Sequence, residues 1–201
     1  TRDCHMYYVG LMEYWWNGVR FYFIDNEYFF GRGNPYTDMA GDIVPFIFFS
    51  KAVLASMCAI GFHPDIIHCH DWQAALVPVY LHTVYEGNPF YNGTKTVLTI
   101  HNLHFQGIAN IDTVKYHSNI PEYAFSPDRL EFNADANIMK GGIVYSNFVT
   151  TVSNTYANEI RTPEYGEALE GVLNDYAYKL GGIVNGVDYD VYNPGTDWYI
   201  Y

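Results

Sequence analysis

The chain is poor in positive charge. It has 10 Lys and Arg residues against 22 Asp and Glu in 201 residues, a formal net charge of −12 at pH 7, and the basic residues are scattered. Nucleic acids and anionic membranes attract proteins through clustered cations that meet phosphates. The composition therefore argues against either partner. It also offers no cation cluster for the diphosphate of a nucleotide.

Long apolar runs and a disulfide framework are also lacking. Charges, Gly and Pro interrupt the apolar stretches, so no membrane span is expected, and residues 1–5 lack the layout of a secretory signal. The cysteines are Cys4, Cys58 and Cys69, an odd number. Two of them lie in apolar runs, where they are expected as small core residues. This usage favours a reducing compartment.

What the chain does have is enough apolar sequence for one α/β domain. Hydrophobic residues make up 49% of it, and 20 tyrosines contribute to an aromatic content of 18%. The apolar fraction indicates a globular protein with a substantial core. Rings with polar edges suit carbohydrate surfaces, although most single rings are expected in the core.

Apolar periodicity and turn residues predict strands that alternate with helices. The expected strands are 5–13 and 19–25, joined as a hairpin by a turn at 16–18, then 65–70, 95–101, 148–151 and 180–184. The expected helices are 43–60 with Pro45 in its first turn, 72–85 with Asp71 as N-cap, 134–146, and 155–161 with Ser153 as N-cap. This order indicates a parallel, Rossmann-like sheet with helices on both faces.

Polar clusters follow each of the last four expected strands. They lie at 68–71, 101–102, 153 and 185–186. In sheets of this kind, ligands bind where the carboxyl ends of the strands meet the loops. The sequence therefore predicts a ligand site at this edge of the sheet.

Four motifs resemble bacterial glycogen synthase and plant starch synthase. They are DIIHCHDWQ at 65–73, TIHNLHFQG at 99–107, MKGGIVY at 139–145 with TTVSNTY at 150–156, and GIVNGVD at 182–188. They have the order and spacing of that family, and the resemblance extends from about Gly18 to Pro194.

The resemblance implies a GT-B glycosyltransferase, with two Rossmann-like domains that face each other across a cleft. It implies transfer of glucose from ADP-glucose or UDP-glucose to the non-reducing end of an α-1,4-glucan, with retention of configuration and without a metal or other cofactor. Residues 1–201 are expected to be a single partial N-terminal domain that lacks the family's first strand, loop and helix. The C-terminal domain, which carries the family's diphosphate-binding Arg and Lys, would be a partner, so the fragment is expected to be inactive alone. The expected location is the bacterial cytoplasm or, for a plant protein, the plastid.

The resemblance also assigns roles to three residues. His101 matches a histidine that contacts the donor glucose, and it is the expected catalytic residue. Asp71 matches an acceptor-side aspartate, and Asn185 matches a donor-site asparagine; both are expected to bind substrate. Each has a structural alternative: His101 could cap the next turn, Asp71 could cap a helix, and Asn185 could serve an Asn-Gly turn.

Two further features differ from the family's functional motifs. The family binds phosphate with Lys-x-Gly-Gly in its first strand–helix turn, whereas Lys140-Gly141-Gly142 lies in an expected helix. Its glycines are expected to allow close helix packing. Pro45 stands where the family often has Arg, and 132–137 replaces a run that usually contains Gly and Gln, so those family features do not carry over.

Two other functions fit parts of the sequence. A non-catalytic carbohydrate-binding module would use the aromatic residues and the strand-end polar groups, and it would bind maltooligosaccharides without a donor. A metal-dependent hydrolase would use His68 and His70, which share one face of a strand. Stoichiometric zinc in the purified protein would favour the hydrolase.

Overall fold

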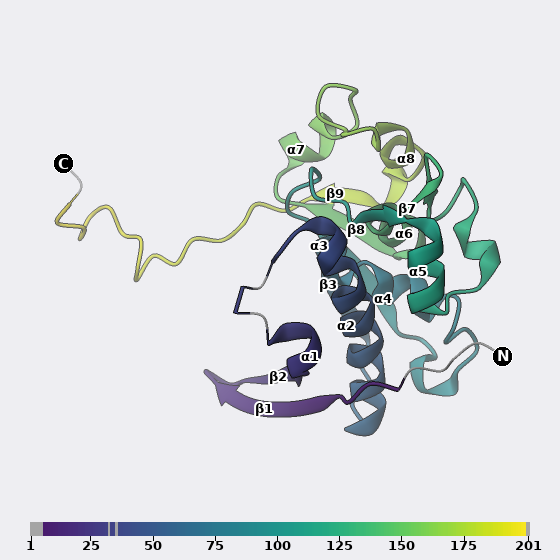
Figure 1. Cartoon of the computed structure of the whole chain (residues 1–201). Coiled ribbons are helices and arrows are strands. Elements are labelled where there is room, and N and C mark those ends of the chain that lie inside the picture. The colour runs from purple at the N-terminus through teal and green to yellow at the C-terminus, as the bar shows by residue number, and fades with distance from the viewer. Residues whose placement is uncertain (1–5, 32, 35, 200–201) are drawn as a thin grey trace.

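The computed structural model describes residues 6–31, 33–34 and 36–199, with only the backbone at 39–40. The expectations for residues 1–5, Cys4 included, lie outside the described residues. A four-stranded parallel sheet in the order β3-β4-β8-β9 forms the centre of the fold, and helices pack against it (Figure 1). The α/β class and the parallel sheet are thus confirmed. The sheet strands are β3 (Ile66–His70), β4 (Lys95–Ile100), β8 (Phe148–Thr151) and β9 (Leu180–Gly182).

The remaining elements surround this sheet. The other strands are β1 (Gly10–Trp16) and β2 (Val19–Asp25), and β5 (Ile108–Asn110), β6 (Glu131–Phe132) and β7 (Asp135–Asn137). The α-helices are α1 (Glu27–Phe30), α2 (Met39–Ala59), α3 (Asp71–Ala74), α4 (Leu76–Leu81), α5 (Ile111–Ser118), α6 (Ile138–Tyr145), α7 (Asn154–Glu159) and α8 (Glu170–Asp175). Short 3-10 helices span Pro89–Tyr91, Glu122–Phe125 and Ala177–Lys179.

The expected hairpin is present as the antiparallel pair β1-β2, which is separate from the main sheet (Figure 1). Trp16 pairs with Val19 across a two-residue turn. Both turn residues, Asn17 (φ 48°) and Gly18 (φ 76°), are left-handed, as a type I′ turn requires. The first strand begins later than expected, at Gly10. The pairing that starts at the turn ends where Gly10 meets Asp25, the last residue of β2.

Helix α2 begins earlier than expected. The carboxylate of Asp38 accepts a hydrogen bond from the Gly41 N–H (2.6 Å) and caps the helix. Pro45 therefore lies inside the helix, and its placement in the first turn was wrong.

The stretch Gly41–Ala59 of α2 is long and apolar enough to cross a membrane, with a mean hydropathy of 1.6. The expectation that no apolar stretch reaches that length was wrong. Half of the stretch is buried, however, and Ile43, Ile47 and Leu54 belong to the main hydrophobic core. Lys51 in the middle of the helix donates to the His117 carbonyl (2.8 Å). These contacts make α2 the core helix of the domain.

Two other expected helices have different boundaries. The helix expected at 72–85 is divided into α3 and α4, because the ring of Pro78 clashes with a helical carbonyl at Ala74, four residues earlier. The helix expected at 134–146 begins only at Ile138. Asn133 (φ 53°) and Ala134 (φ 68°) instead form a left-handed turn that pairs β6 with β7.

The expected caps and core cysteines are partly confirmed. Ser153 caps α7 by accepting from the Tyr156 N–H (2.9 Å), as expected. Cys69 is buried in β3, and burial raises the pKa of its thiol to about 12. Cys58 is exposed near the end of α2, so its expected place in the core was wrong.

The run Lys140-Gly141-Gly142 lies in α6 and serves packing. A Cβ atom at Gly142 would lie 2.6 Å from the Ala75 Cβ, so the expectation of close helix packing is confirmed. Lys140 is 5% exposed, and its ammonium donates to the carbonyls of Pro127 (2.5 Å) and Glu131 (2.6 Å). The lysine is thus held inside the fold by backbone carbonyls.

Replacing Gly142 with alanine is expected to lower the free energy of unfolding by about 1–3 kcal/mol, because the added methyl overpacks the α6–Ala75 contact. Gly171 in α8 is the matched control, because a Cβ atom there meets nothing within 4 Å. Gly171→Ala is expected to stabilise the protein by about 0.5–1 kcal/mol. Urea denaturation measures both, and a Gly142→Ala protein as stable as the Gly171→Ala protein would contradict the close contact.

Candidate functional site

The carboxyl ends of β3 and β4 bring Asp71 and His101 together, as expected. The parallel register pairs His70 with Thr99, so the residues after each strand lie at one edge of the sheet. The His70 Nδ1 lies 2.9 Å from the His101 Nε2, and both side chains are exposed. Two residues 31 positions apart thus form a pair of imidazoles at this edge.

Asp71 fixes the backbone of the neighbouring loop. Its Oδ1 accepts from the His101 N–H (2.7 Å) and, at 3.5 Å, from the Asn102 N–H. The N-cap position of α3 belongs to His70, so the placement of Asp71 as N-cap was wrong. Asp71 has a φ of 55°, a left-handed conformation that Asp tolerates better than most residues. A strained backbone of this kind is common at functional sites.

A separate hydrogen-bonded chain begins at His68, whose ring lies beside that of His70. The His68 Nε2 lies 2.6 Å from the Thr99 hydroxyl, which lies 2.5 Å from the Thr150 hydroxyl. Partial burial of the ring lowers the pKa of His70, the imidazoles of His68 and His101 lower it further, and the Asp71 carboxylate opposes the shift. The lowered pKa favours the neutral form of His70, and a neutral imidazole can both donate to and accept from hydroxyl groups.

His68 and His70 face the same side of β3, with ring centroids 4.3 Å apart. Each ring has a different partner, Thr99 for His68 and His101 for His70. Within the described residues, no group of three or more His, Cys, Asp or Glu side chains could hold a metal ion. The geometry of these rings thus gives no support to the hydrolase alternative.

Asn185 does not join this group in the structure. It is exposed in the segment after β9, which extends away from the domain (Figure 1). The Ile183 N–H donates to the Thr151 carbonyl (2.8 Å), and this is the last ladder contact before Asn185. Neither Asn185 nor Gly186 has a left-handed φ, so the Asn-Gly turn alternative is not found either. The role of Asn185 in substrate binding stays a prediction.

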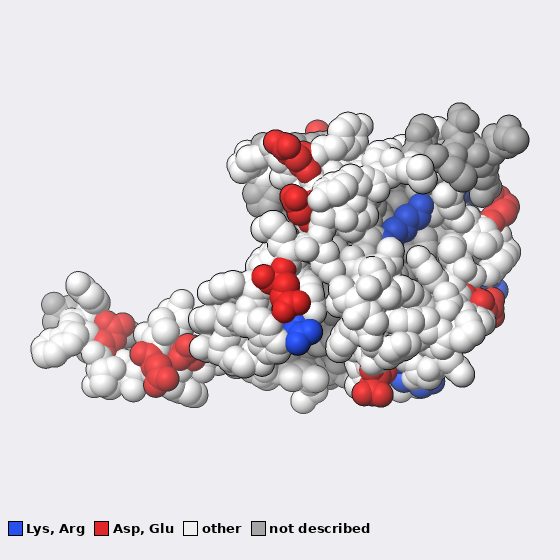
Figure 2. Space-filling model, turned by 90° about the horizontal axis from the view of Figure 1, so that it is seen from below, with Lys and Arg blue, Asp and Glu red and all other residues white. Residues whose placement is uncertain are grey.

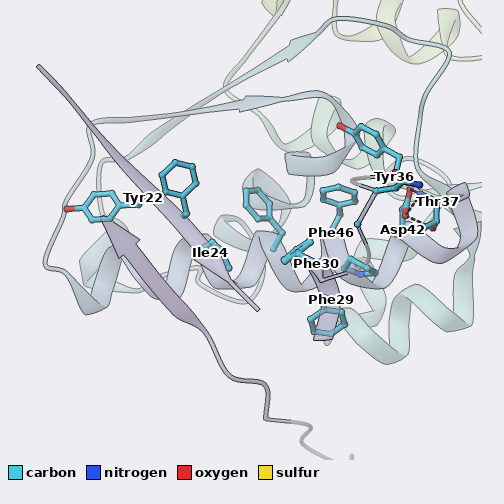
Figure 3. Close-up of a pocket in the computed structure, with 13 residues that line it drawn as sticks. Tyr22, Ile24, Phe29, Phe30, Tyr36, Thr37, Asp42 and Phe46 are labelled. Carbon is cyan, nitrogen blue, oxygen red and sulfur yellow. Dashed lines mark hydrogen bonds between the residues drawn. The ribbon is translucent and has the colours of Figure 1, made fainter. Parts of the chain in front are cut away.

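The sequence interpretation missed an aromatic cavity of about 540 Å³ between β2, α1 and α2 (Figure 3). The Phe46 ring in its wall packs edge-on against Trp72, with centroids 5.1 Å apart, and Trp72 follows Asp71. The carboxylate of Asp42 is fixed in the wall by the Thr37 N–H and hydroxyl. The density of aromatic residues in 21–49 was the only signal, because three separate segments form the cavity. Its lining includes Tyr22, Ile24, Phe29, Phe30, Tyr36, Thr37, Asp42 and Phe46.

Cations do not gather on the surface seen from below, where the few Lys and Arg side chains stand apart from one another (Figure 2). Lys51 and Lys179 donate to backbone carbonyls, as Lys140 does. Burial lowers the pKa of Lys179 to about 8. These three ammonium groups therefore serve the fold, and none of them is placed to meet a diphosphate.

Residues 1–175 match the family model described as "Starch synthase catalytic domain". The chain belongs to this family. Its relatives include the glycogen synthase of Lachnospira eligens, 55% identical over 190 residues, which are 94% of this chain and 40% of that protein. The glycogen synthase of Lachnoclostridium phytofermentans is 52% identical over 193 residues, 96% of this chain and 40% of that protein. This member of the family thus spans about 40% of the length of the curated relatives it matches.

The fold comparison agrees with the family. The catalytic domain of starch synthase IV from Arabidopsis thaliana, solved with ADP and acarbose bound, superimposes with a TM-score of 0.86 at 35% sequence identity. The match covers 98% of this chain and 41% of that one. The expected α/β fold of a GT-B starch synthase is confirmed. The domain boundary at 1–201 stays a prediction.

Proposed function

We propose that this starch synthase family member forms the sugar-binding part of a retaining glucosyltransferase. The enzyme would transfer glucose from a nucleotide-glucose to the non-reducing end of an α-1,4-glucan. The observation that carries the proposal is the arrangement of His101, His70 and Asp71 at the carboxyl edge of the sheet, where this architecture binds ligands.

The geometry suits His101 for contact with a glucose hydroxyl. Its Nε2 meets His70, which leaves the Nδ1 without a partner among the described residues. Asp71 accepts the 2.7 Å hydrogen bond from the His101 N–H, and this bond fixes the backbone that carries the ring. A preorganised hydrogen-bonding group at the reacting sugar stabilises the transition state without reorganisation.

The partners follow from what the site contains. A neutral glucan needs hydroxyl partners of the kind found here, whereas a diphosphate needs cations. The three lysines held inside the fold do not supply them. A C-terminal domain is therefore the proposed source of the diphosphate-binding cations, and the bacterial cytoplasm or the plastid is the proposed location.

A chimera tests the proposal. This chain would replace the matching region of the Lachnospira eligens glycogen synthase, and incorporation of labelled glucose from ADP-glucose or UDP-glucose into glycogen would be measured. We expect the chimera to transfer glucose. We expect the 201-residue chain alone to give no incorporation above a blank without protein, because stabilisation of a departing diphosphate is a large part of catalysis.

One outcome would contradict the proposal. A folded chimera without transfer would remove the catalytic role. In that case, maltooligosaccharide binding by the chain alone would make the carbohydrate-binding module the better interpretation, and the aromatic cavity would be its first candidate surface.

A further inference from the structure

A strained turn lies in the loop between α7 and α8. The Leu169 N–H donates to the Gly166 carbonyl (2.7 Å), and both central residues, Glu167 (φ 48°) and Ala168 (φ 64°), are left-handed. This is the φ pattern of a type I′ turn, which normally uses Gly, Asn or Asp. Two consecutive residues that disfavour this conformation persist only where the surroundings hold them.

A buried side chain holds this turn against the loop that follows His101. Gln106 is 4% exposed, and its Nε2 donates to the Glu167 carbonyl (2.9 Å). The Gln106 Oε1 accepts from the Asn137 Nδ2 (2.6 Å), and Asn137 in turn caps α6. The position of Glu167 is thus tied to the core of the domain, although its own side chain is exposed.

The turn directs Glu167 at His104. The His104 Nδ1 lies 3.3 Å from the Glu167 Oε1, and the side chains are 65% and 47% exposed. The His104 N–H donates to the Asn102 Oδ1 (3.0 Å), which tightens the loop only three residues after His101. The exposed ring of Phe105 packs edge-on against His104, with centroids 5.2 Å apart. A carboxylate, an imidazole and an aromatic face therefore lie together beside the site.

These three groups suit one kind of substrate. A carboxylate and an imidazole can share hydrogen bonds with neighbouring sugar hydroxyls, while a ring covers the apolar face of a pyranose. The negative charge of Glu167 opposes an anionic diphosphate but not a neutral glucan. We propose that Glu167 and His104 determine specificity on the acceptor side by binding hydroxyl groups of the α-1,4-glucan. This inference rests on the proposed function.

Two measurements test the pair. In the chimera, Glu167→Ala is expected to raise the KM for maltoheptaose about fivefold or more, because a hydrogen bond to a glucan hydroxyl is lost. Turnover and the KM for the nucleotide-glucose are expected to stay within about twofold. In the 201-residue chain, an NMR titration with maltoheptaose is expected to shift the His104, Phe105 and Glu167 signals. The Glu167→Ala chain is expected to bind about fivefold more weakly.

Matched variants separate binding from folding. Glu167→Gln keeps the shape and a hydrogen-bonding amide, so it is expected to recover a KM within about twofold of the wild type. Ala168→Gly relieves the left-handed strain without touching the carboxylate, so it is expected to raise the melting temperature and leave the KM unchanged. If Glu167→Ala folds poorly, the double variant with Ala168→Gly carries the test.

If Glu167→Ala left the KM for the glucan unchanged, the proposal that Glu167 and His104 bind glucan would be wrong. It would also be wrong if the substitution raised the KM for the nucleotide-glucose instead. Neither outcome touches the proposed function, which depends on transfer by the chimera and on His101. If the chimera is inactive, the NMR titration still decides whether Glu167 binds glucan.

Discussion

Turnover of the chimeric synthase is expected to fall by about two orders of magnitude or more when His101 is replaced with alanine. The ring lies at the carboxyl edge of the sheet, and its one described hydrogen bond is to His70. The contact that orders the local backbone runs from the His101 N–H to Asp71, and alanine keeps it. The protein should therefore remain folded, and the loss should appear mainly in turnover rather than in KM.

His63→Ala is the matched control for this prediction. His63 lies just before β3, at the opposite end of the strand, and its ring packs against Phe90 in a tilted arrangement with centroids 3.9 Å apart. We expect its turnover to stay within about twofold of the wild type. Melting temperature and turnover would be measured on the same preparations. If His101→Ala kept more than about a third of the turnover, less than ~1 kcal/mol of barrier would be involved, and His101 would have no catalytic role.

The edge of the sheet could be predicted because it depends on local patterns. Short apolar strands, each followed by polar residues, give the parallel sheet and the place where His101 and Asp71 meet. The same reasoning placed Ser153 correctly as a cap. It misjudged α6, because the left-handed pair Asn133 and Ala134 starts a β-turn inside a segment with helical apolar spacing.

The contacts between distant segments could not be predicted from the sequence. His104 meets Glu167 across 63 positions, and this contact depends on a turn that lacks the usual glycine. The aromatic cavity likewise needs β2, α1 and α2 to come together. Asn185 is the opposite case, a residue that the motif identified but the structure does not bring to the site. Its motif matches the family, yet it lies near neither His101 nor Asp71. Motif spacing identifies candidates, but only the tertiary structure decides which of them meet.

Asp71 anchors the His101 backbone and is also proposed to bind a glucan hydroxyl, and two substitutions distinguish these roles. Glycine is a better replacement than alanine for removing the Asp71 side chain, because a φ of 55° would strain alanine but not glycine. Asp71→Gly removes the acceptor for the His101 and Asn102 N–H groups, so the loop that carries His101 loses its anchor. We expect chimera turnover to fall about 100-fold and the melting temperature to drop, since a charge-assisted hydrogen bond is lost.

Asp71→Asn keeps an oxygen for the His101 N–H and tolerates the left-handed backbone, so its melting temperature is expected to match the wild type. It replaces the second carboxylate oxygen with a donor, where a glucan hydroxyl would donate. We therefore expect turnover to fall about tenfold, between the wild type and Asp71→Gly. Full turnover in Asp71→Asn would make Asp71 a positioning residue alone. Full turnover in Asp71→Gly would show that Asp71 has no role in the reaction. If the loop that carries His101 takes part in catalysis, deleting the carboxylate that anchors this loop should lower turnover.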